Sequence, residues 1–284
     1  MKSKTKFSNN VPSQWCPGCP NHLILKALQN GLEELELTPQ EVCLVSGIGQ
    51  AAKLPHYLKG NFFNGLHGRA LPVATGIKLA NPKLKVIVTT GDGDCYGEGG
   101  NHFLHTLRRN PDITLLIHNN SIYALTKGQA SPTTPKGEKR ALNPRGVEDE
   151  PLNPLALALI QGTGFVARCS ALEIEHLKEV IKEAINYPGL AYVDILQPCI
   201  SWLKPSLETL KKETFFLSHD PQDFEQALKI ALDPAQKWGL GIIYKNPWPK
   251  PVLGEGFYQH FSLEQLTHLP PLDLTIAQNL LKAH

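Results

Sequence analysis

The sequence predicts an α/β protein built on a doubly wound, mostly parallel sheet, with a C-terminal arm. Short apolar segments alternate with segments whose apolar residues recur at helical spacing. This alternation is typical of parallel strands joined by crossover helices, which cover both faces of the sheet. The 284 residues, 42% of them hydrophobic and 19% charged, are enough to form a substantial core.

Each element is predicted from its local pattern. The strands are short, nearly continuous apolar runs, as expected for strands that are buried on both faces. In chain order the strands cover residues 42–46, 84–90, 113–118, 165–168 and 190–196, and the helices cover residues 21–37, 70–79, 99–109, 154–161 and 171–186. From about residue 201 this alternation ends, because prolines cluster and only one strand (239–244) and one helix (272–282) are predicted. We therefore expect an α/β domain over residues 1–200 and a C-terminal extension over residues 201–284.

Composition and charge exclude several classes of protein. A formal net charge of only +2 argues against a nucleic-acid-binding protein that works by neutralising phosphates. No apolar stretch approaches the roughly 20 residues that span a membrane, and residues 1–11 lack the apolar core of a secretory signal. Six cysteines are too few for a disulfide scaffold in a chain of this length. We therefore expect a cytoplasmic protein that binds neither nucleic acid nor membrane.

Glycine-rich or polar motifs directly follow several predicted strands. They are GIGQ (47–50), GDGD (91–94), NN (119–120) and QPC (197–199). In open α/β sheets, ligands bind outside the carboxyl ends of the strands. The sequence therefore predicts one ligand site at this edge of the sheet.

The GDG and NN motifs together are typical of a site for Mg²⁺ and a diphosphate. Mg²⁺ prefers hard oxygen ligands, which the Asp92 carboxylate, the Asn120 amide and the backbone carbonyl of Ile122 can supply. One strand–helix–strand crossover separates the two motifs, so that the two strand ends can lie side by side. Gly91 and Gly93 allow the backbone to approach the diphosphate closely. The alternative is an acidic turn followed by an unrelated asparagine turn.

Two other motifs allow alternative interpretations. The GIGQAA segment (47–52) also fits a dinucleotide-binding fingerprint, but Pro55 interrupts the helix that this fingerprint requires. Cys16 and Cys19, in the segment CPGC, are compatible with zinc, a redox dithiol or an iron–sulfur cluster. Zinc would need a second closely spaced pair, which the sequence lacks, whereas spacing alone does not exclude a dithiol.

The sequence around these motifs resembles the β subunits of 2-oxoacid:ferredoxin oxidoreductases, which bind thiamine diphosphate. The matching segments are WCPGCPNHLIL (15–25), VSGIGQAAKLPHY (45–57), GLHGRALPVATGIKLANP (65–82), GDGDCYGEGGNHFLHTLRRN (91–110), NNSIYALTKGQASPTT (119–134) and ILQPC (195–199). They occur in the family order and cover roughly residues 15 to 200. The resemblance implies a sheet of the thiamine-diphosphate-binding type.

The resemblance also implies which residues contact the cofactor and the substrate. Asp92, Asn120 and Ile122 would bind Mg²⁺. The residues expected to contact thiamine diphosphate are Gly49, His67, Gly68, Arg69, Gly91, Asp92, Gly93, Asp94, Asn120, Ile122, Tyr123, Leu125 and Thr126. Lys53 and Lys127 would act on the substrate, since a lysine at the first position faces the 2-oxoacid carboxylate in the family. The alternative for both lysines is a solvated surface position.

By the same resemblance, Cys16, Cys19 and Cys199 would hold a [4Fe–4S] cluster. The family has a further cysteine directly after Gly-Ile-Gly, where this chain has Gln50. Cys43 cannot replace it, because seven residues along a strand span roughly 23 Å. Cys95 lies at the correct edge of the sheet and is a possible fourth ligand. A non-cysteine ligand, a three-iron cluster and a lost cluster are the other possibilities.

The reaction implied is the coenzyme-A-dependent oxidative decarboxylation of a 2-oxoacid, for which 2-oxoglutarate is the first choice. An α subunit would supply the pyrimidine-binding domain and the catalytic glutamate, and a ferredoxin or ferredoxin-like subunit would accept electrons. The chain alone would thus be half of the enzyme, active only in a hetero-oligomer. Two other functions stay open: a component of a non-redox thiamine-diphosphate decarboxylase or synthase, and a non-catalytic iron–sulfur electron-transfer module.

Overall fold

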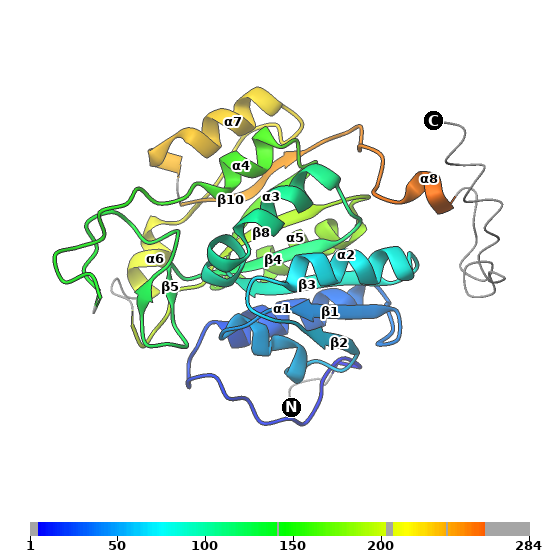
Figure 1. Ribbon diagram of the computed structural model, residues 1–284, viewed down its shortest axis with the longest axis horizontal. Coiled ribbons are helices and arrows are strands. Elements are labelled where there is room, and N and C mark those ends of the chain that lie inside the picture. The colour runs from blue at the N-terminus through cyan, green and yellow to red at the C-terminus, as the bar shows by residue number, and fades with distance from the viewer. Residues whose placement is uncertain (1–4, 141, 203–206, 237, 259–284) are drawn as a thin grey trace, which may run out of the picture.

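A computed structural model describes residues 5–140, 142–202, 207–236 and 238–258. An eight-stranded sheet runs through the molecule with the strand order β2-β1-β3-β4-β8-β7-β10-β9 (Figure 1). Five of the predicted strands are present and pair in parallel: β1 (Val42–Ser46), β3 (Lys85–Gly91), β4 (Thr114–Asn119), β7 (Phe165–Ser170) and β8 (Ala191–Leu196). The prediction of a mostly parallel α/β sheet is therefore confirmed.

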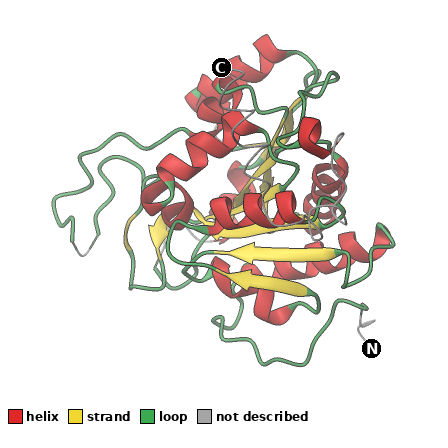
Figure 2. Ribbon diagram, turned by 45° about the vertical axis from the view of Figure 1, so that its right-hand side comes forward, coloured by secondary structure: helices red, strands yellow, loops and turns green. Residues whose placement is uncertain are grey.

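Helices cover both faces of this sheet (Figure 2). On one face lie α1 (Asn21–Glu34) and α5 (Ile174–Asn186), which pack against each other and share one core cluster with the sheet. On the other face lie α2 (Ala70–Ala80), α3 (Gly100–Arg109), α4 (Pro154–Ile160) and α7 (Phe224–Leu232). The apolar strands are buried on both sides because each face carries its own layer of helices.

The C-terminal residues complete the sheet before the chain leads away from it. The predicted strand near residue 240 is β10 (Gly239–Lys245), which pairs antiparallel with β7 and parallel with the short β9 (Phe215–Phe216). α7 packs on α4, whereas α8 (Glu255–Tyr258) stands apart from the sheet in Figure 1. Residues 207–245 are thus continuous with the α/β core, and the helix predicted at 272–282 lies outside the described residues.

Several short elements were not predicted. β2 (Asn61–Asn64) forms one edge of the sheet, and β5 (Ile122–Tyr123) and β6 (Gln129–Ala130) form a separate two-stranded ribbon. Also not predicted are α6 (Leu207–Glu213), the 3₁₀ helices η1 (Ala51–Tyr57) and η3 (Pro234–Gln236), the π-helical turn η2 (Gly93–Glu98), and β9, α7 and α8.

The segment after Gly47-Ile48-Gly49 argues against dinucleotide binding. That fingerprint requires an α-helix directly after the glycines. The structure has η1 there instead, a 3₁₀ helix that contains Pro55.

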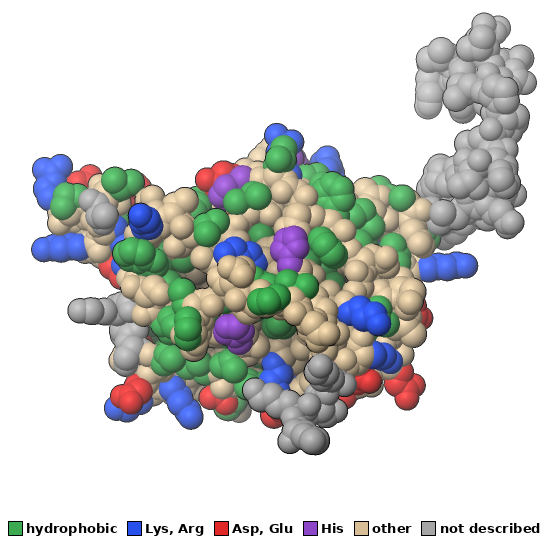
Figure 3. Space-filling view, turned by 90° about the horizontal axis from the view of Figure 1, so that it is seen from below, with side chains coloured by type: hydrophobic (Ala, Val, Ile, Leu, Met, Phe, Trp, Pro, Cys, Tyr) green, Lys and Arg blue, Asp and Glu red, His purple; other side chains and the backbone are tan. Residues whose placement is uncertain are grey.

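Within the described part of the chain, no helix is both long enough and apolar enough to cross a bilayer. On the face shown in Figure 3, the charged side chains lie mainly along the rim, with acidic and basic groups interspersed.

Candidate active site

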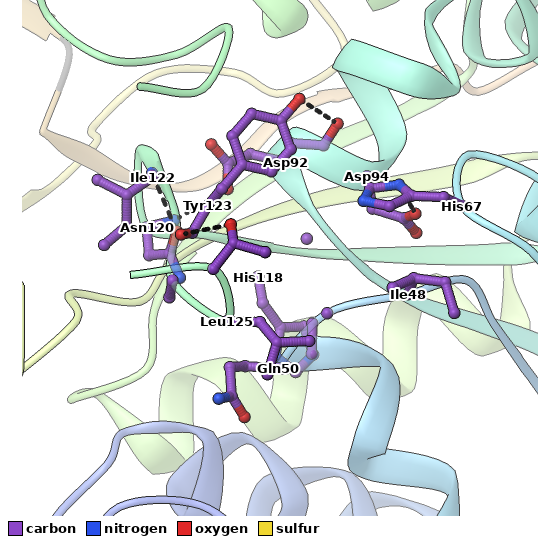
Figure 4. Close-up of a pocket in the computed structure, with 16 residues that line it drawn as sticks. Ile48, Gln50, His67, Asp92, Asp94, His118, Asn120, Ile122, Tyr123 and Leu125 are labelled. Atoms are coloured by element: carbon purple, nitrogen blue, oxygen red, sulfur yellow. Dashed lines mark hydrogen bonds and ion pairs between the residues drawn. The ribbon is translucent and has the colours of Figure 1, made fainter. Parts of the chain in front are cut away.

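The strand ends on one edge of the sheet surround a cavity of about 550 Å³, here called the main cavity (Figure 4). Eleven of the predicted cofactor-binding residues line it: Gly49, His67, Gly91, Asp92, Gly93, Asp94, Asn120, Ile122, Tyr123, Leu125 and Thr126. The end of β1, the end of β3 and the residues after β4 therefore meet at one place, as the motif positions predict.

Asp92 is a buried carboxylate with one oxygen committed to neighbouring hydroxyls. Its side chain is 1% exposed, and its Oδ2 accepts hydrogen bonds from Ser131 Oγ at 2.5 Å and Thr133 Oγ1 at 2.7 Å. Its Oδ1 has a long contact of 3.5 Å from the backbone N–H of Asn120, and the backbone N–H of Gly93 also interacts with the carboxylate. Burial raises the pKa of Asp92 to about 6, and the hydrogen bonds from Ser131 and Thr133 oppose this rise. A cation at Oδ1 would compensate the buried negative charge.

The two asparagines after β4 have different roles. Asn119 holds the loop together, because its Nδ2 donates to the buried Asp194 carboxylate at 3.0 Å and its Oδ1 accepts from Thr133 at 3.0 Å. Asn120 faces the main cavity, and its Oδ1 accepts the backbone N–H of Ile122 at 3.1 Å. In Figure 4, Asp92, Asn120 and Ile122 lie on the same side of the cavity.

The opposite wall is formed by His67 and Asp94. His67 Nδ1 lies 2.7 Å from Asp94 Oδ1, which also accepts the backbone N–H of Gly68 at 2.7 Å. The other Asp94 oxygen accepts Thr90 Oγ1 at 2.5 Å. Asp94 lines the cavity, but these bonds occupy its carboxylate and fix the loop before α2 to the end of β3.

Four predicted residues do not line the main cavity. Gly68 is buried beside it with a left-handed φ of 71°, and a Cβ there would lie 2.5 Å from the backbone of Glu98. Arg69 is exposed at the start of α2. Lys53 is half-buried on η1, and Lys127 is exposed with a left-handed φ of 77°.

Next to the main cavity lies a second one of about 400 Å³, here called the cysteine cavity. Cys16, Cys19 and Cys199 all line it, although Cys199 is far from the other two in the sequence. Gln50 lines both cavities, and its Oε1 is buried without a hydrogen-bond partner among the described residues. Burial raises the pKa of the Cys19 thiol, against the effect of its hydrogen bonds from Asn21.

The other three cysteines lie elsewhere. Cys95 is 3% exposed and packs in the core between the sheet and α2 and α3, not in the cysteine cavity. Its place at the sheet edge is as predicted, but the π-helical turn directs its side chain into the core. Cys43 and Cys169 are buried core thiols.

Some residues of the site could not be identified from the sequence. Ser131 and Thr133 bond Asp92 from the connection between β6 and α4. His118 ends the apolar core of β4 and lines the main cavity, while Asn21 lines the cysteine cavity. No pattern in the sequence distinguishes these polar residues from ordinary structural ones.

The residues present fit the expected groups. A buried carboxylate beside an amide oxygen is a hard-oxygen donor set that suits Mg²⁺ and a diphosphate. Among the described residues, no three His, Cys, Asp or Glu side chains are placed to hold a single metal ion. An iron–sulfur cluster distributes its thiolates over separate iron atoms, and three cysteines around one cavity are compatible with that arrangement.

Comparisons with known proteins agree with this geometry. Residues 45–195 match the family model "Thiamine pyrophosphate enzyme, C-terminal TPP binding domain". Subunit beta of 2-oxoacid:ferredoxin oxidoreductase 1 from Aeropyrum pernix is 44% identical over 255 residues, which are 85% of this chain and 80% of the relative. The beta subunit from Saccharolobus solfataricus is 44% identical over 250 residues, 82% of each chain.

A solved structure is similar over nearly the whole chain. It is the 2-oxoglutarate:ferredoxin oxidoreductase of Magnetococcus marinus with 2-oxoglutarate, coenzyme A and succinyl-CoA bound. The TM-score is 0.89 at 32% identity, covering 99% of this chain and 97% of that one. The parallel sheet, the cavity at its carboxyl edge and these relatives together show that this chain belongs to the β subunits of the 2-oxoacid:ferredoxin oxidoreductases.

Proposed function

We propose that this chain binds Mg²⁺ and thiamine diphosphate and catalyses, with partner subunits, the oxidative decarboxylation of a 2-oxoacid. The balanced reaction joins the acyl group to the coenzyme A thiol, releases carbon dioxide and a proton, and passes two electrons to ferredoxin one at a time. Bound thiamine diphosphate supplies the chemistry of decarboxylation. The residues of the chain bind and orient it and provide a route for the electrons.

The observation that carries the proposal is the Asp92 site. Its carboxylate is buried and fixed by two hydroxyls, and its Oδ1 is the oxygen nearest Asn120. Asp92 Oδ1, Asn120 Oδ1 and the Ile122 carbonyl are the proposed protein ligands of Mg²⁺. The wall formed by Gly91, Gly93 and the loop at Tyr123–Thr126 would enclose the diphosphate and the adjoining ring.

The electron route would begin in the cysteine cavity. We assign Cys16, Cys19 and Cys199 as thiolate ligands of an iron–sulfur cluster, in a four-iron or a three-iron form. The fourth corner would have no cysteine, because Cys95 packs in the core and position 50 is a glutamine with an unpartnered side-chain oxygen. The two cavities share Gln50, Asn120 and Ala124, so a cluster would lie directly beside the cofactor.

The substrate and the partners follow from the family and from the open cavity. Lys53 and Lys127 are the proposed cations for the 2-oxoacid carboxylate, and 2-oxoglutarate is the proposed substrate, as in the similar Magnetococcus marinus structure. An α subunit would supply the pyrimidine-binding domain with its glutamate, and ferredoxin or a ferredoxin-like subunit would accept the electrons. All six cysteines are free, which fits a reducing compartment such as the cytoplasm.

Asp92→Ala tests the cofactor site directly. Removing a buried charged ligand costs on the order of 2–5 kcal/mol, or roughly thirtyfold or more in affinity. We expect calorimetry of the assembled protein to show this loss for Mg²⁺-thiamine diphosphate, whereas Asp149→Ala, on an exposed loop, should bind as wild type does. Equal affinity of Asp92→Ala and wild type would show that the metal site is elsewhere.

A further inference from the structure

Two buried polar side chains, Asn21 and His118, lie in the wall between the main cavity and the cysteine cavity. Each is 1% exposed. Asn21 is the first residue of α1 and lines the cysteine cavity, whereas His118 lies near the end of β4 and lines the main cavity. Buried polar groups of this kind are costly unless they are hydrogen-bonded, so their partners indicate what they do.

The contact between them fixes the tautomer of the imidazole. His118 Nδ1 lies 2.7 Å from Asn21 Oδ1. An amide oxygen can only accept, so Nδ1 carries the proton and donates it. Its Nε2 is buried and has no partner among the described residues.

The other end of the Asn21 side chain reaches the cysteine cavity. Asn21 and Cys19 line this cavity together, and the backbone and side-chain amides of Asn21 lower the pKa of the Cys19 thiol against the effect of burial. Gln197 Nε2 is a further donor at 3.9 Å. With its oxygen held by His118, the Asn21 amide can present only its N–H₂ to Cys19. His118 thus fixes the donor that faces the sulfur.

We propose that Asn21 and His118 are positioning residues that raise the reduction potential of the cluster bound through Cys19. This inference rests on the proposed function, since it needs the cluster. Hydrogen bonds to cluster sulfurs are among the factors that set such potentials, because they stabilise the more negatively charged reduced state. Cys19 is therefore the ligand through which residues of the cofactor wall act on the cluster.

The test is a redox titration followed by paramagnetic resonance, on complexes assembled anaerobically with the partner subunit. His118→Phe keeps a ring but removes the Nδ1–H, and Asn21→Leu removes the donor itself. We expect both variants to titrate at more negative potentials than wild type with equal iron content. His219→Phe is the matched control, because this half-buried histidine bonds the Ile243 carbonyl and lines neither cavity, and it should titrate as wild type does.

A rescue variant separates positioning from general damage. His118→Gln restores an N–H that can donate to Asn21 Oδ1, so the potential should return toward the wild-type value. If Asn21→Leu loses its iron, the reduction potentials of His118→Phe and His118→Gln are compared with that of wild type, since both variants keep Asn21. Wild-type potentials in iron-loaded His118→Phe would overturn this inference alone. Wild-type complex without iron would overturn the cluster assignment together with it.

Discussion

At the scale of single residues, Asp92 shows a conflict between binding and stability. The fold buries this carboxylate almost completely, and only a long contact of 3.5 Å joins its Oδ1 to the backbone N–H of Asn120. Burial raises its pKa from an ordinary value of 3.8 to about 6. A group whose pKa is raised by folding stabilises the folded state below its unfolded pKa, and this contribution disappears as the pH rises through the folded pKa.

We therefore predict that Asp92→Asn stabilises the metal-free protein near neutral pH while it destroys the metal site. A shift from 3.8 to about 6 corresponds to roughly 3 kcal/mol, at about 1.4 kcal/mol per pKa unit. The free energy of unfolding of wild type should thus fall between about pH 4 and pH 7 by up to this amount, and the variant should lack that fall. Urea unfolding at several pH values in this range measures how the free energy of unfolding changes with pH in wild type and in the variant. Asp149→Asn is the control and should show the same change with pH as wild type.

If the free energy of unfolding had the same dependence on pH in wild type and in Asp92→Asn, the Asp92 carboxyl would ionise normally in the folded protein.

The sequence identified Asp92 because it follows a predicted strand and has a glycine on each side. It could not identify Ser131 and Thr133, because their contact with Asp92 depends on how the chain folds back after β6. His118 was also missed, since it ends an apolar strand in the way that a core residue does.

At the scale of elements, the segment at 12–20 shows how a stretch without regular structure is held in place. Trp15 is 6% exposed, and its Nε1 donates a hydrogen bond to the Gln50 carbonyl at 2.8 Å. Its ring packs edge-on against the Tyr57 ring, with 4.7 Å between the two ring centroids. The Gln14 backbone N–H also bonds the Tyr57 hydroxyl at 2.9 Å. These contacts position Cys16 and Cys19 against the turn after β1.

Trp15→Phe should loosen this segment selectively. The variant loses the hydrogen bond to Gln50 and part of the ring contact, together worth about 1–2 kcal/mol. We expect the amides of residues 14–19 to exchange hydrogen roughly tenfold faster, at about 1.4 kcal/mol per factor of ten, as measured by mass spectrometry. Trp248→Phe, at a tryptophan that is 82% exposed, should leave exchange in residues 14–19 unchanged.

Unchanged hydrogen exchange of residues 14–19 in Trp15→Phe would indicate that other contacts hold this segment in place.

The elements that the sequence predicted well are those with strong apolar patterns, such as β3, in which Val86, Ile87 and Val88 are fully or almost fully buried. β2 was missed because all four of its residues are exposed, so it has no burial pattern. β5 and β6 have only two residues each, which is too few to show a burial pattern.

At the scale of the whole molecule, the main cavity opens beside exposed apolar side chains. Ile48 and Leu125 line the cavity and are 40% and 45% exposed, and Leu66, next to His67, is 73% exposed. Exposed apolar groups around a ligand pocket are typical of a surface that another subunit covers. This placement fits an enzyme whose cofactor is shared between two chains.

We predict that the chain purified without partners does not reduce a viologen dye with any 2-oxoacid and coenzyme A. Activity should appear when the α subunit is added, because half of the cofactor would otherwise remain in water. The control is the same assay on the complex assembled with Asp92→Ala, which should stay inactive. Turnover by the isolated chain would disprove the need for a shared site.

The π-helical turn η2 has a consequence for how this fold tolerates changes in length. It connects the end of β3 at Asp92 to α3, and the Gly99 N–H bonds the Asp94 carbonyl five residues back. Such a turn holds one residue more than an α-helical turn. The extra residue rotates the helix that follows, α3, by about 100° about its axis. Deleting one residue there would turn Phe103 and Leu107 away from the core, or else swing Asp92 out of the cavity. This stretch therefore does not accept a change in the number of its residues.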